Sequence, residues 1–553
     1  MSTFSPHLLA NIDEHDIPES HLHYALLATT IPRTYREARQ SPDWEHWHTA
    51  MMAELAKMTR YNVWDIVVRS ETIRTLKGRW VFDRKIDGET GAPTEFKARW
   101  VAKGYSQVEG LDYEELFASV AHKDSIRVFL SVVNHLDLEL DQIDIKSAFL
   151  NGDLEETIYM EPPEGSDIPA GSICLLKKSL YGLRQASRCF RDKYHAKLTE
   201  MGFKPSIADD CIYIRCLDAS LIMLSLHVDD SLVAGNNRVE LDIFKNQLNE
   251  IFELKDCGPA SYFLGFNIFR DRPHKRLWIS QQHYLNDVLD RFGMKDCNPA
   301  ILPLPSGFQP VPATDEEFAS ARDLDFPAIA GAVQYAATIT RPDLAYAANV
   351  LCRYMSKWSN THYQAAKHLL RYIKGTVDLC LLWDDVACHR TVLGYADADW
   401  GGCVTTRRST TGYVFKTFGG ASAWHSRRQP TVALATSEAE YMASCEAARQ
   451  AIWLKQLLID MGLYPGGPFP ILNDNIGAIQ LSKNPVQHDR SKHIDMRHHF
   501  LRENVTSKAI DLAHVSTQEN VADTLTKALP KESFQRFRNE LGLVKMSDLI
   551  KGE

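Results

Sequence analysis

Two adjacent aspartates, Asp229 and Asp230, interrupt a strongly apolar stretch of the chain. Apolar runs lie on both sides of the pair, at 221–226 and 231–234, and predict a hairpin with the acids at its turn. Neighbouring carboxylates in such a setting repel each other and lose solvation, so a compensating positive charge is expected. A pair of divalent cations would supply that charge and would support phosphoryl transfer. The alternative is an ordinary exposed turn, in which aspartate is common.

The length and net charge of the chain limit the kinds of fold and surface that can surround Asp229 and Asp230. With 553 residues the chain is too long for one hydrophobic core, and three or four domains are expected. A net charge of −9 excludes a polycation that coats nucleic acid, so any basic surface must be local. The segment 177–197, where Lys and Arg alternate with aromatic residues, is either such a surface or an ordinary solvated helix.

The chain carries 11 cysteines without a C-x-x-C pair, which favours a reducing, intracellular compartment over a zinc site or a disulfide framework. It lacks both a secretion signal and an apolar run of about 18 residues, so neither secretion nor membrane insertion is predicted.

Apolar periodicity predicts a helix over 42–58 and a hairpin from strands at 80–86 and 96–101. Prolines crowd the segment 299–312 and indicate a domain boundary near 304. Helical patterns resume at 328–374, and strand-like and helical segments alternate from 391 to about 531.

A third acid, Asp144, lies in a separate strand-like run and could complete a metal site with the pair. Four strings then occur in order: KARWVAKG at 97–104, QIDIKSAFLNGDL at 142–154, LYGLRQA at 180–186 and VDD at 228–230. Together they resemble the reverse transcriptases of copia-type long-terminal-repeat retrotransposons. The resemblance extends over 32–530, in the order polymerase, connection and nuclease.

For the first half, the resemblance implies a right-hand fold of fingers, palm and thumb. Asp144, Asp229 and Asp230 would hold two Mg²⁺ in the palm. The expected contacts to the incoming nucleotide come from Lys85, Arg99, Phe149 and Gln185.

Phe149 matches the position of an aromatic ring that packs against the sugar and excludes a ribose 2′-hydroxyl. Plain core packing is the alternative for this residue. The chain departs from the family pattern at His227, where tyrosine is usual, and at Ser187, where proline is usual. Because the usual tyrosine is not a metal ligand, His227 puts fidelity or nucleotide binding in doubt before it puts catalysis in doubt.

Four further acids, in contexts that alternate strand and helix, resemble the ribonuclease H of copia-type elements: Asp397, Glu440, Asp474 and Asp523. The resemblance implies two Mg²⁺ and an activated water that attacks the RNA phosphate. Asp399 lies two residues after Asp397, and Glu438 lies two residues before Glu440. These two acids are the alternative candidates if the match to the family is shifted by two residues.

His514 corresponds to a mobile histidine that aids product release in related nucleases. A cluster of histidines does not have the spacing of a zinc site and resembles a string of copia-type nucleases, so a structural or substrate-contact role is expected. The cluster comprises His488, His493, His498 and His499.

The expected fold is a multidomain α/β (α+β) protein. The predicted domains are a helical lead-in (1–60), the reverse transcriptase with fingers, palm and thumb (61–303), a connection (304–390), a ribonuclease H-like α/β domain (391–535) and a tail (536–553). The expected function is RNA-directed DNA synthesis with cleavage of RNA/DNA hybrids. The alternatives are a catalytically silent nucleic-acid-binding remnant and a nuclease or integrase of the ribonuclease H fold alone.

The expected cofactor is Mg²⁺ or Mn²⁺, with two ions at each site. The expected partners are an RNA template, a DNA primer, an RNA/DNA hybrid, deoxynucleoside triphosphates and other Gag and Pol products, without a membrane. The resemblance also implies a protease and an integrase upstream in a polyprotein, so the chain would be a fragment or a separate product. Its expected location is the cytoplasm, in a virus-like particle, or the nucleus.

Overall fold

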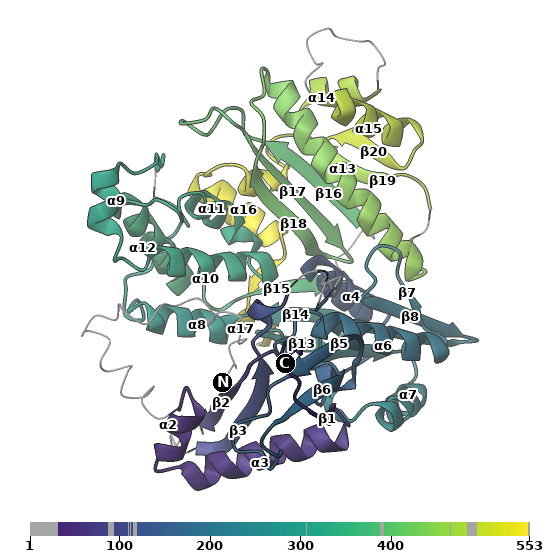
Figure 1. Cartoon of the computed structure of the whole chain (residues 1–553). Coiled ribbons are helices and arrows are strands. Elements are labelled where there is room, and N and C mark those ends of the chain that lie inside the picture. The colour runs from purple at the N-terminus through teal and green to yellow at the C-terminus, as the bar shows by residue number, and fades with distance from the viewer. Residues whose placement is uncertain are drawn as a thin grey trace.

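Helices and strands are mixed along the chain, which confirms the predicted α/β architecture (Figure 1). The computed structural model describes residues 31–550 apart from 87–92, 109, 111, 114–118, 306, 387–391, 465 and 484–494. Within this part of the chain, no helix is long and apolar enough to cross a membrane.

The N-terminal region packs two helices against a hairpin and a small sheet. Trp47, Trp80 and Trp100 form its core and are 2% exposed or less. Its elements are α2 (Tyr35–Gln40), α3 (Trp44–Arg60), β1 (Trp64–Val68), the hairpin β2 (Gly78–Ile86) and β3 (Pro93–Ala102), η3 (Gly104–Ser106), β5 (Asp153–Met160) and β6 (Ser172–Lys178). The predicted helix over 42–58 and the predicted hairpin are both confirmed.

The predicted palm is a six-stranded sheet in the order β11-β4-β10-β9-β8-β7. Its strands are β4 (Glu139–Ile145), β7 (Lys204–Pro205), β8 (Ile212–Leu217), β9 (Ser220–His227), β10 (Asp230–Gly235) and β11 (Leu254–Pro259). Its helices are α4 (Lys123–His135), α5 (Ala148–Asn151), α6 (Ala186–Glu200) and α7 (Arg238–Ile251). The hairpin predicted around the two aspartates is formed by β9 and β10.

A third sheet joins segments that are far apart in the sequence, in the order β12-β13-β14-β15-β21. Its strands are β12 (Tyr262–Phe263), β13 (Phe266–Asp271), β14 (Arg276–Ser280), β15 (Leu379–Asp384) and β21 (Leu543–Lys545). The adjoining helices are α8 (Gln282–Arg291), α9 (Asp315–Ala321), α10 (Phe326–Ile339), η4 (Pro342–Leu344), α11 (Ala345–Cys352), α12 (Asn360–Lys374), α16 (Lys531–Glu540) and α17 (Met546–Ile550). The segment predicted as a tail thus contributes β21 and is part of the fold.

The last sheet has the order β18-β17-β16-β19-β20. Its first three strands are antiparallel, whereas β19 runs parallel to β16 and β20 parallel to β19. This arrangement, with α13 across one face (Figure 1), matches the predicted ribonuclease H-like domain. The elements are β16 (Val392–Ala398), β17 (Thr410–Thr417), β18 (Gly420–Arg428), α13 (Thr436–Asp460), β19 (Phe469–Asn473), α14 (Ile476–Lys483), α15 (Asp495–Thr506), β20 (Ile510–His514) and η6 (Val521–Leu525).

One buried arginine of the palm helix α4 connects three parts of the chain. Arg127 Nε donates to the Ser422 carbonyl at 2.7 Å, and Nη1 donates to the Thr338 carbonyl at 2.6 Å. Its guanidinium also pairs with Asp124 and lies 3.7 Å from the centre of the Trp424 ring. The palm, α10 and β18 therefore share one charge-assisted contact.

We expect Arg127→Ala to lower the free energy of unfolding by about 3–5 kcal/mol, because it leaves several carbonyls without their donor and Asp124 without its cation. Urea unfolding followed by circular dichroism measures this loss. Arg322→Ala is the matched control, since the Arg322 side chain is 67% exposed, and its effect should stay below about 1 kcal/mol. Equal effects of the two substitutions would show that Arg127 does not hold the parts together.

Candidate active sites

The palm sheet brings three sequence-predicted acids to one place. Asp230 opens β10 directly opposite Asp144 near the end of β4, so their side chains lie on the same face. Asp229 lies in the tight turn before Asp230, and its carbonyl accepts a hydrogen bond from the Ile145 N–H at 2.9 Å. Val228 completes the turn with a φ of 60°, which a β-branched side chain rarely adopts. The turn is therefore a strained structure that fixes the position of Asp229.

The environment of these acids disfavours their charged form. Burial raises the pKa of Asp230 to about 6, and the charges of Asp229 and Asp144 add to this effect. Burial also raises the pKa of Asp229. Carboxylate oxygens are the ligands that Mg²⁺ prefers, so the chemistry of the triad fits a divalent cation. Among the described residues, however, this triad is not one of the groups whose ligand atoms all lie within 4.8 Å of one another.

Two predicted nucleotide contacts lie together beside the triad, around Tyr181. The Arg99 guanidinium lies 5.5 Å from the centre of the Tyr181 ring, and the Phe149 ring meets Tyr181 edge to face at 5.0 Å. Burial raises the pKa of Tyr181 to about 12, and the charges of Asp229 and Asp144 contribute to the rise. Tyr181 belongs to a string that marks the family, but the sequence did not assign it a role.

The other two predicted nucleotide contacts lie elsewhere. Lys85 pairs with Glu95 at 2.8 Å, and along the hairpin it is four residues, about 13 Å, from the register position of Arg99. Gln185 is fully buried, accepts a hydrogen bond from Gln107 and donates one to the Asp112 carbonyl at 2.8 Å. The Gln185 amide thus holds the surrounding loops together, and its contact with nucleotide stays a prediction.

Two further residues, His227 and Lys255, flank the palm acids. His227 ends β9 opposite Asp230, and burial lowers its pKa. Lys255 on β11 lies opposite Asp144, so the sheet places a cation beside the acids that the sequence did not identify. Neighbouring strands set this contact, and no local pattern marks it.

The four acids of the second site come from four separate elements of the last sheet and its helices. Asp397 lies near the end of β16, Glu440 in the second turn of α13, Asp474 directly after β19, and Asp523 within η6. Ligand oxygens of Asp397, Glu440 and Asp474 all lie within 4.8 Å of one another. Asp397, Glu440 and Asp523 are 4% exposed or less. The structure therefore gathers all four predicted acids.

The alternative register is disfavoured by the roles of the neighbouring acids. Asp399 accepts a hydrogen bond from the backbone N–H of Thr410. Glu438 accepts one from the N–H of Leu434 at 2.7 Å, just before α13 begins. Both carboxylates thus stabilise local backbone, and neither belongs to the group of acids whose oxygens converge.

The second site is crowded with negative charge. Burial and the neighbouring carboxylates raise the pKa of Asp397 and of Glu440, and burial raises that of Asp523. Asp523 Oδ1 is buried and receives no hydrogen bond of good geometry, although Lys527 Nζ lies 2.8 Å away. An incompletely satisfied oxygen beside three converging carboxylates fits a Mg²⁺ or Mn²⁺ ion.

Side chains that the sequence did not predict support these acids. The Asn473 amide donates to Glu440 Oε2 at 3.0 Å, and the Thr526 hydroxyl donates to Asp397 Oδ2. Lys527 lies four residues after Asp523, a spacing that typically produces an ion pair on a helical turn and could have indicated it. His514 is exposed at the end of β20, opposite Asn473, which places it on the strand beside Asp474.

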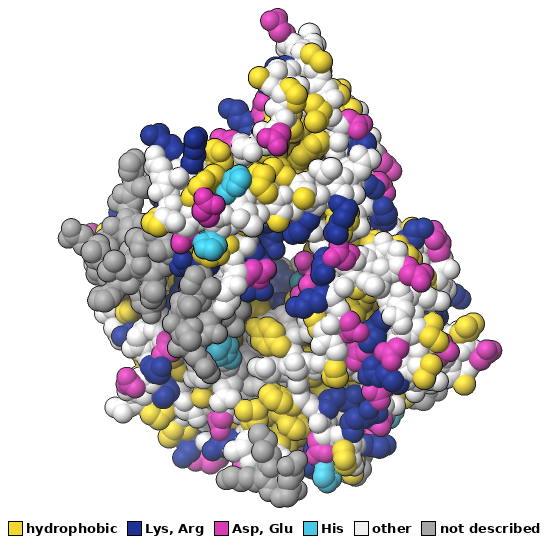
Figure 2. All heavy atoms as spheres, turned by 90° about the horizontal axis from the view of Figure 1, so that it is seen from below, with side chains coloured by type: hydrophobic (Ala, Val, Ile, Leu, Met, Phe, Trp, Pro, Cys, Tyr) yellow, Lys and Arg dark blue, Asp and Glu magenta, His cyan; other side chains and the backbone are white. Residues whose placement is uncertain are grey.

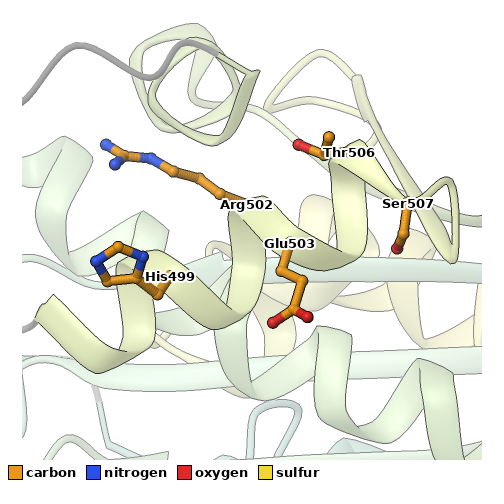
Figure 3. A pocket seen from close by; sticks show the side chains of 5 residues that line it. All are labelled: His499, Arg502, Glu503, Thr506 and Ser507. Carbon is orange, nitrogen blue, oxygen red and sulfur yellow. The ribbon is translucent and has the colours of Figure 1, made fainter.

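Of the histidine cluster, the described part of the chain includes the side chain of His499. His488 and His493 fall outside the described residues, as does the side chain of His498. His499 lines a shallow pocket along α15 together with Arg502, Glu503, Thr506 and Ser507 (Figure 3). None of the predicted acids lines this pocket, so it is separate from the nuclease site.

The basic segment 177–197 is partly buried and partly paired within the chain. Its aromatic residues Phe190 and Tyr194 are buried in the core, and several of its cations pair with acids of this chain, including Arg191 with Asp210 and Lys193 with Asp153. Lys and Arg side chains gather around a hollow near the centre of the face seen in Figure 2. A local basic surface therefore exists despite the negative net charge.

Comparison with known proteins places this chain in a family. The protein-family model described as reverse transcriptase (RNA-dependent DNA polymerase) matches residues 61–306. The Pol polyprotein of transposon TNT 1-94 from Nicotiana tabacum is 38% identical over 519 residues, which is 93% of this chain and 39% of the relative. That of transposon RE2 from Arabidopsis thaliana is 35% identical over 529 residues, covering 94% of this chain and 35% of the relative.

The chain thus spans a little more than a third of the length of these relatives. Among solved structures, a foamy viral protease-reverse transcriptase in complex with double-stranded DNA is 12% identical, with a TM-score of 0.23, over 88% of this chain and 72% of that one. The family assignment rests on the two plant polyproteins and on the matched reverse transcriptase region. The chain belongs to the family of copia-type retrotransposon Pol proteins.

Proposed function

We propose that this chain copies RNA into DNA and cleaves the RNA strand of the resulting hybrid, each at its own site. The observation that carries the proposal is the presence of two separate groups of buried or half-buried acids on two different sheets. Structural acids are usually matched by nearby cations, whereas these groups carry more negative charge than the side chains around them neutralise.

At the palm site, the 3′-hydroxyl of a primer would attack the α-phosphate of a nucleotide and release pyrophosphate. Asp144, Asp229 and Asp230 would hold the divalent cations, which lower the pKa of the attacking hydroxyl and neutralise the phosphate charge. Arg99 would bind the triphosphate, and Phe149 would contact the sugar. These contacts would orient the nucleotide toward the primer.

At the second site, water would attack a phosphate of the RNA strand. Asp397, Glu440 and Asp474 form the group that would bind a cation first, because their oxygens already converge. Asn473 and Thr526 restrict the orientations of Glu440 and Asp397 through their hydrogen bonds. The exposed His514 would contact the product as it leaves.

Phe149→Val is expected to increase incorporation of ribonucleotides relative to deoxynucleotides by roughly 10–100-fold, because it removes the ring that would clash with a 2′-hydroxyl. Single-nucleotide extension with each substrate measures the ratio of the two kcat/KM values. Phe149→Tyr keeps the ring and should keep the ratio of the wild type. If valine leaves the ratio unchanged, Phe149 is only a core residue.

The proposed function is tested by two assays on the full chain with Mg²⁺. Primer extension on an RNA template and cleavage of labelled RNA in a hybrid should both occur, and EDTA should abolish both. Absence of both products from folded protein would instead support a catalytically silent nucleic-acid-binding remnant. Cleavage without extension would leave the ribonuclease H-fold nuclease as the function.

A further inference from the structure

The nuclease acids are divided between two kinds of contact. Asp397, Glu440 and Asp474 converge on a space between their oxygens. Asp523 lies outside that group, and the Lys527 ammonium lies 2.8 Å from its Oδ1 and 3.9 Å from Oδ2 of Asp397. Lys527 therefore bridges Asp397 and Asp523.

The backbone holds Lys527 in this position. Its N–H donates to the Asp523 carbonyl at 3.3 Å, so the two residues share one helical turn. Thr526, the residue before it, donates its hydroxyl to Asp397. The Lys527 side chain is 39% exposed, whereas those of Asp397 and Asp523 are 1% and 5% exposed. The ammonium thus reaches the buried acids from the solvent side and can also withdraw to it.

We propose that Lys527 acts as a resident cation at the Asp397–Asp523 side of the nuclease site, where a second divalent ion would otherwise bind. The site then takes one divalent ion tightly, at Asp397, Glu440 and Asp474. A second ion binds only when Lys527 leaves Asp523, so Lys527 is a positioning residue that weakens the second ion. This inference rests on the proposed nuclease function for the identity of the metal ligands.

The physical basis is competition for the same oxygens. An ammonium at 2.8 Å from a carboxylate oxygen occupies the place of a metal ion and neutralises part of the charge that would attract one. Removing the ammonium leaves Asp523 buried without a cation, which increases the attraction for a second ion. The substitution should therefore tighten metal binding, the opposite of what loss of a ligand does.

The test counts Mn²⁺ ions bound to the full chain by isothermal titration calorimetry and electron paramagnetic resonance. Every variant also carries Asp229→Asn and Asp230→Asn, which removes acids of the palm site. With Lys527 present, we expect one tight ion and a second that binds at least about tenfold more weakly. Lys527→Met should tighten the second ion by about tenfold or more, whereas Lys527→Arg should resemble the parent.

Lys531→Met is the matched control, since Lys531 is an exposed lysine four residues further along the chain, at the start of α16. Circular dichroism establishes that each variant is folded. Equal affinity for the second ion in the Lys527→Met chain and its parent would overturn the role of Lys527 while leaving the nuclease proposal intact. Mn²⁺ binding that Asp397→Asn does not reduce would overturn both.

Discussion

Asp229→Asn is expected to reduce primer extension on an RNA template by on the order of 10³-fold or more, equivalent to about 4 kcal/mol of barrier. Asparagine preserves the size of the side chain and the strained turn, but it removes the charge that would hold a cation beside Asp144 and Asp230. Cleavage of an RNA/DNA hybrid by the same variant should stay within about twofold of the wild type, because the nuclease acids lie on another sheet.

Asp218→Asn is the control for this variant. Asp218 also lies in a hairpin turn of the palm sheet with a positive φ of 51°, but it is exposed and distant in register from Asp144. Its substitution should leave extension unchanged. If Asp229→Asn retains normal extension, the polymerase centre is not at this turn.

Asp397→Asn should produce the reverse pattern, with hybrid cleavage reduced by on the order of 10³-fold and extension retained. Asp397 is shared by the converging acids, the Thr526 hydroxyl and Lys527, so losing its charge affects every part of the site. Asp399→Asn tests the alternative register and should cost much less. A larger loss from Asp399→Asn would show that the register is wrong by two residues.

The Asp397→Asn substitution should also change the stability of the folded chain, and the direction of this change should depend on pH. Because burial and neighbouring acids raise the pKa of Asp397, its proton is bound more tightly in the folded chain than in the unfolded one. This stabilisation is complete below the unfolded pKa, about 3.9, and is lost as the pH rises through the folded pKa. In EDTA at pH 8, Asp397→Asn should therefore melt at a higher temperature than the wild type.

At pH 5 in EDTA the difference between the two melting temperatures should shrink, since the wild-type carboxyl regains its proton. Added Mg²⁺ should raise the melting temperature of the wild type more than that of Asp397→Asn, because binding to the folded state stabilises it. A variant that is less stable than the wild type at pH 8 in EDTA would contradict the raised pKa.

The sequence by itself determined the two groups of acids and the elements that carry them. The apolar runs around Asp229 and Asp230 dictate a hairpin, since each strand must bury a face, and the acids are left at the turn. The four nuclease acids could likewise be named before the sheet was known, because each occurs in a family string. Patterns of this kind are local, and local patterns are what a sequence displays directly.

Only the tertiary structure decided which side chains meet these acids. Gln185 lies in a matching string yet is buried and bonded to Gln107, and several cations of 177–197 pair with acids of the same chain. Lys527 reaches Asp397 across 130 residues of sequence. These contacts depend on how distant strands and helices pack. The low-dielectric interior then strengthens the interactions between the buried polar and charged groups. No local pattern of the sequence encodes such contacts.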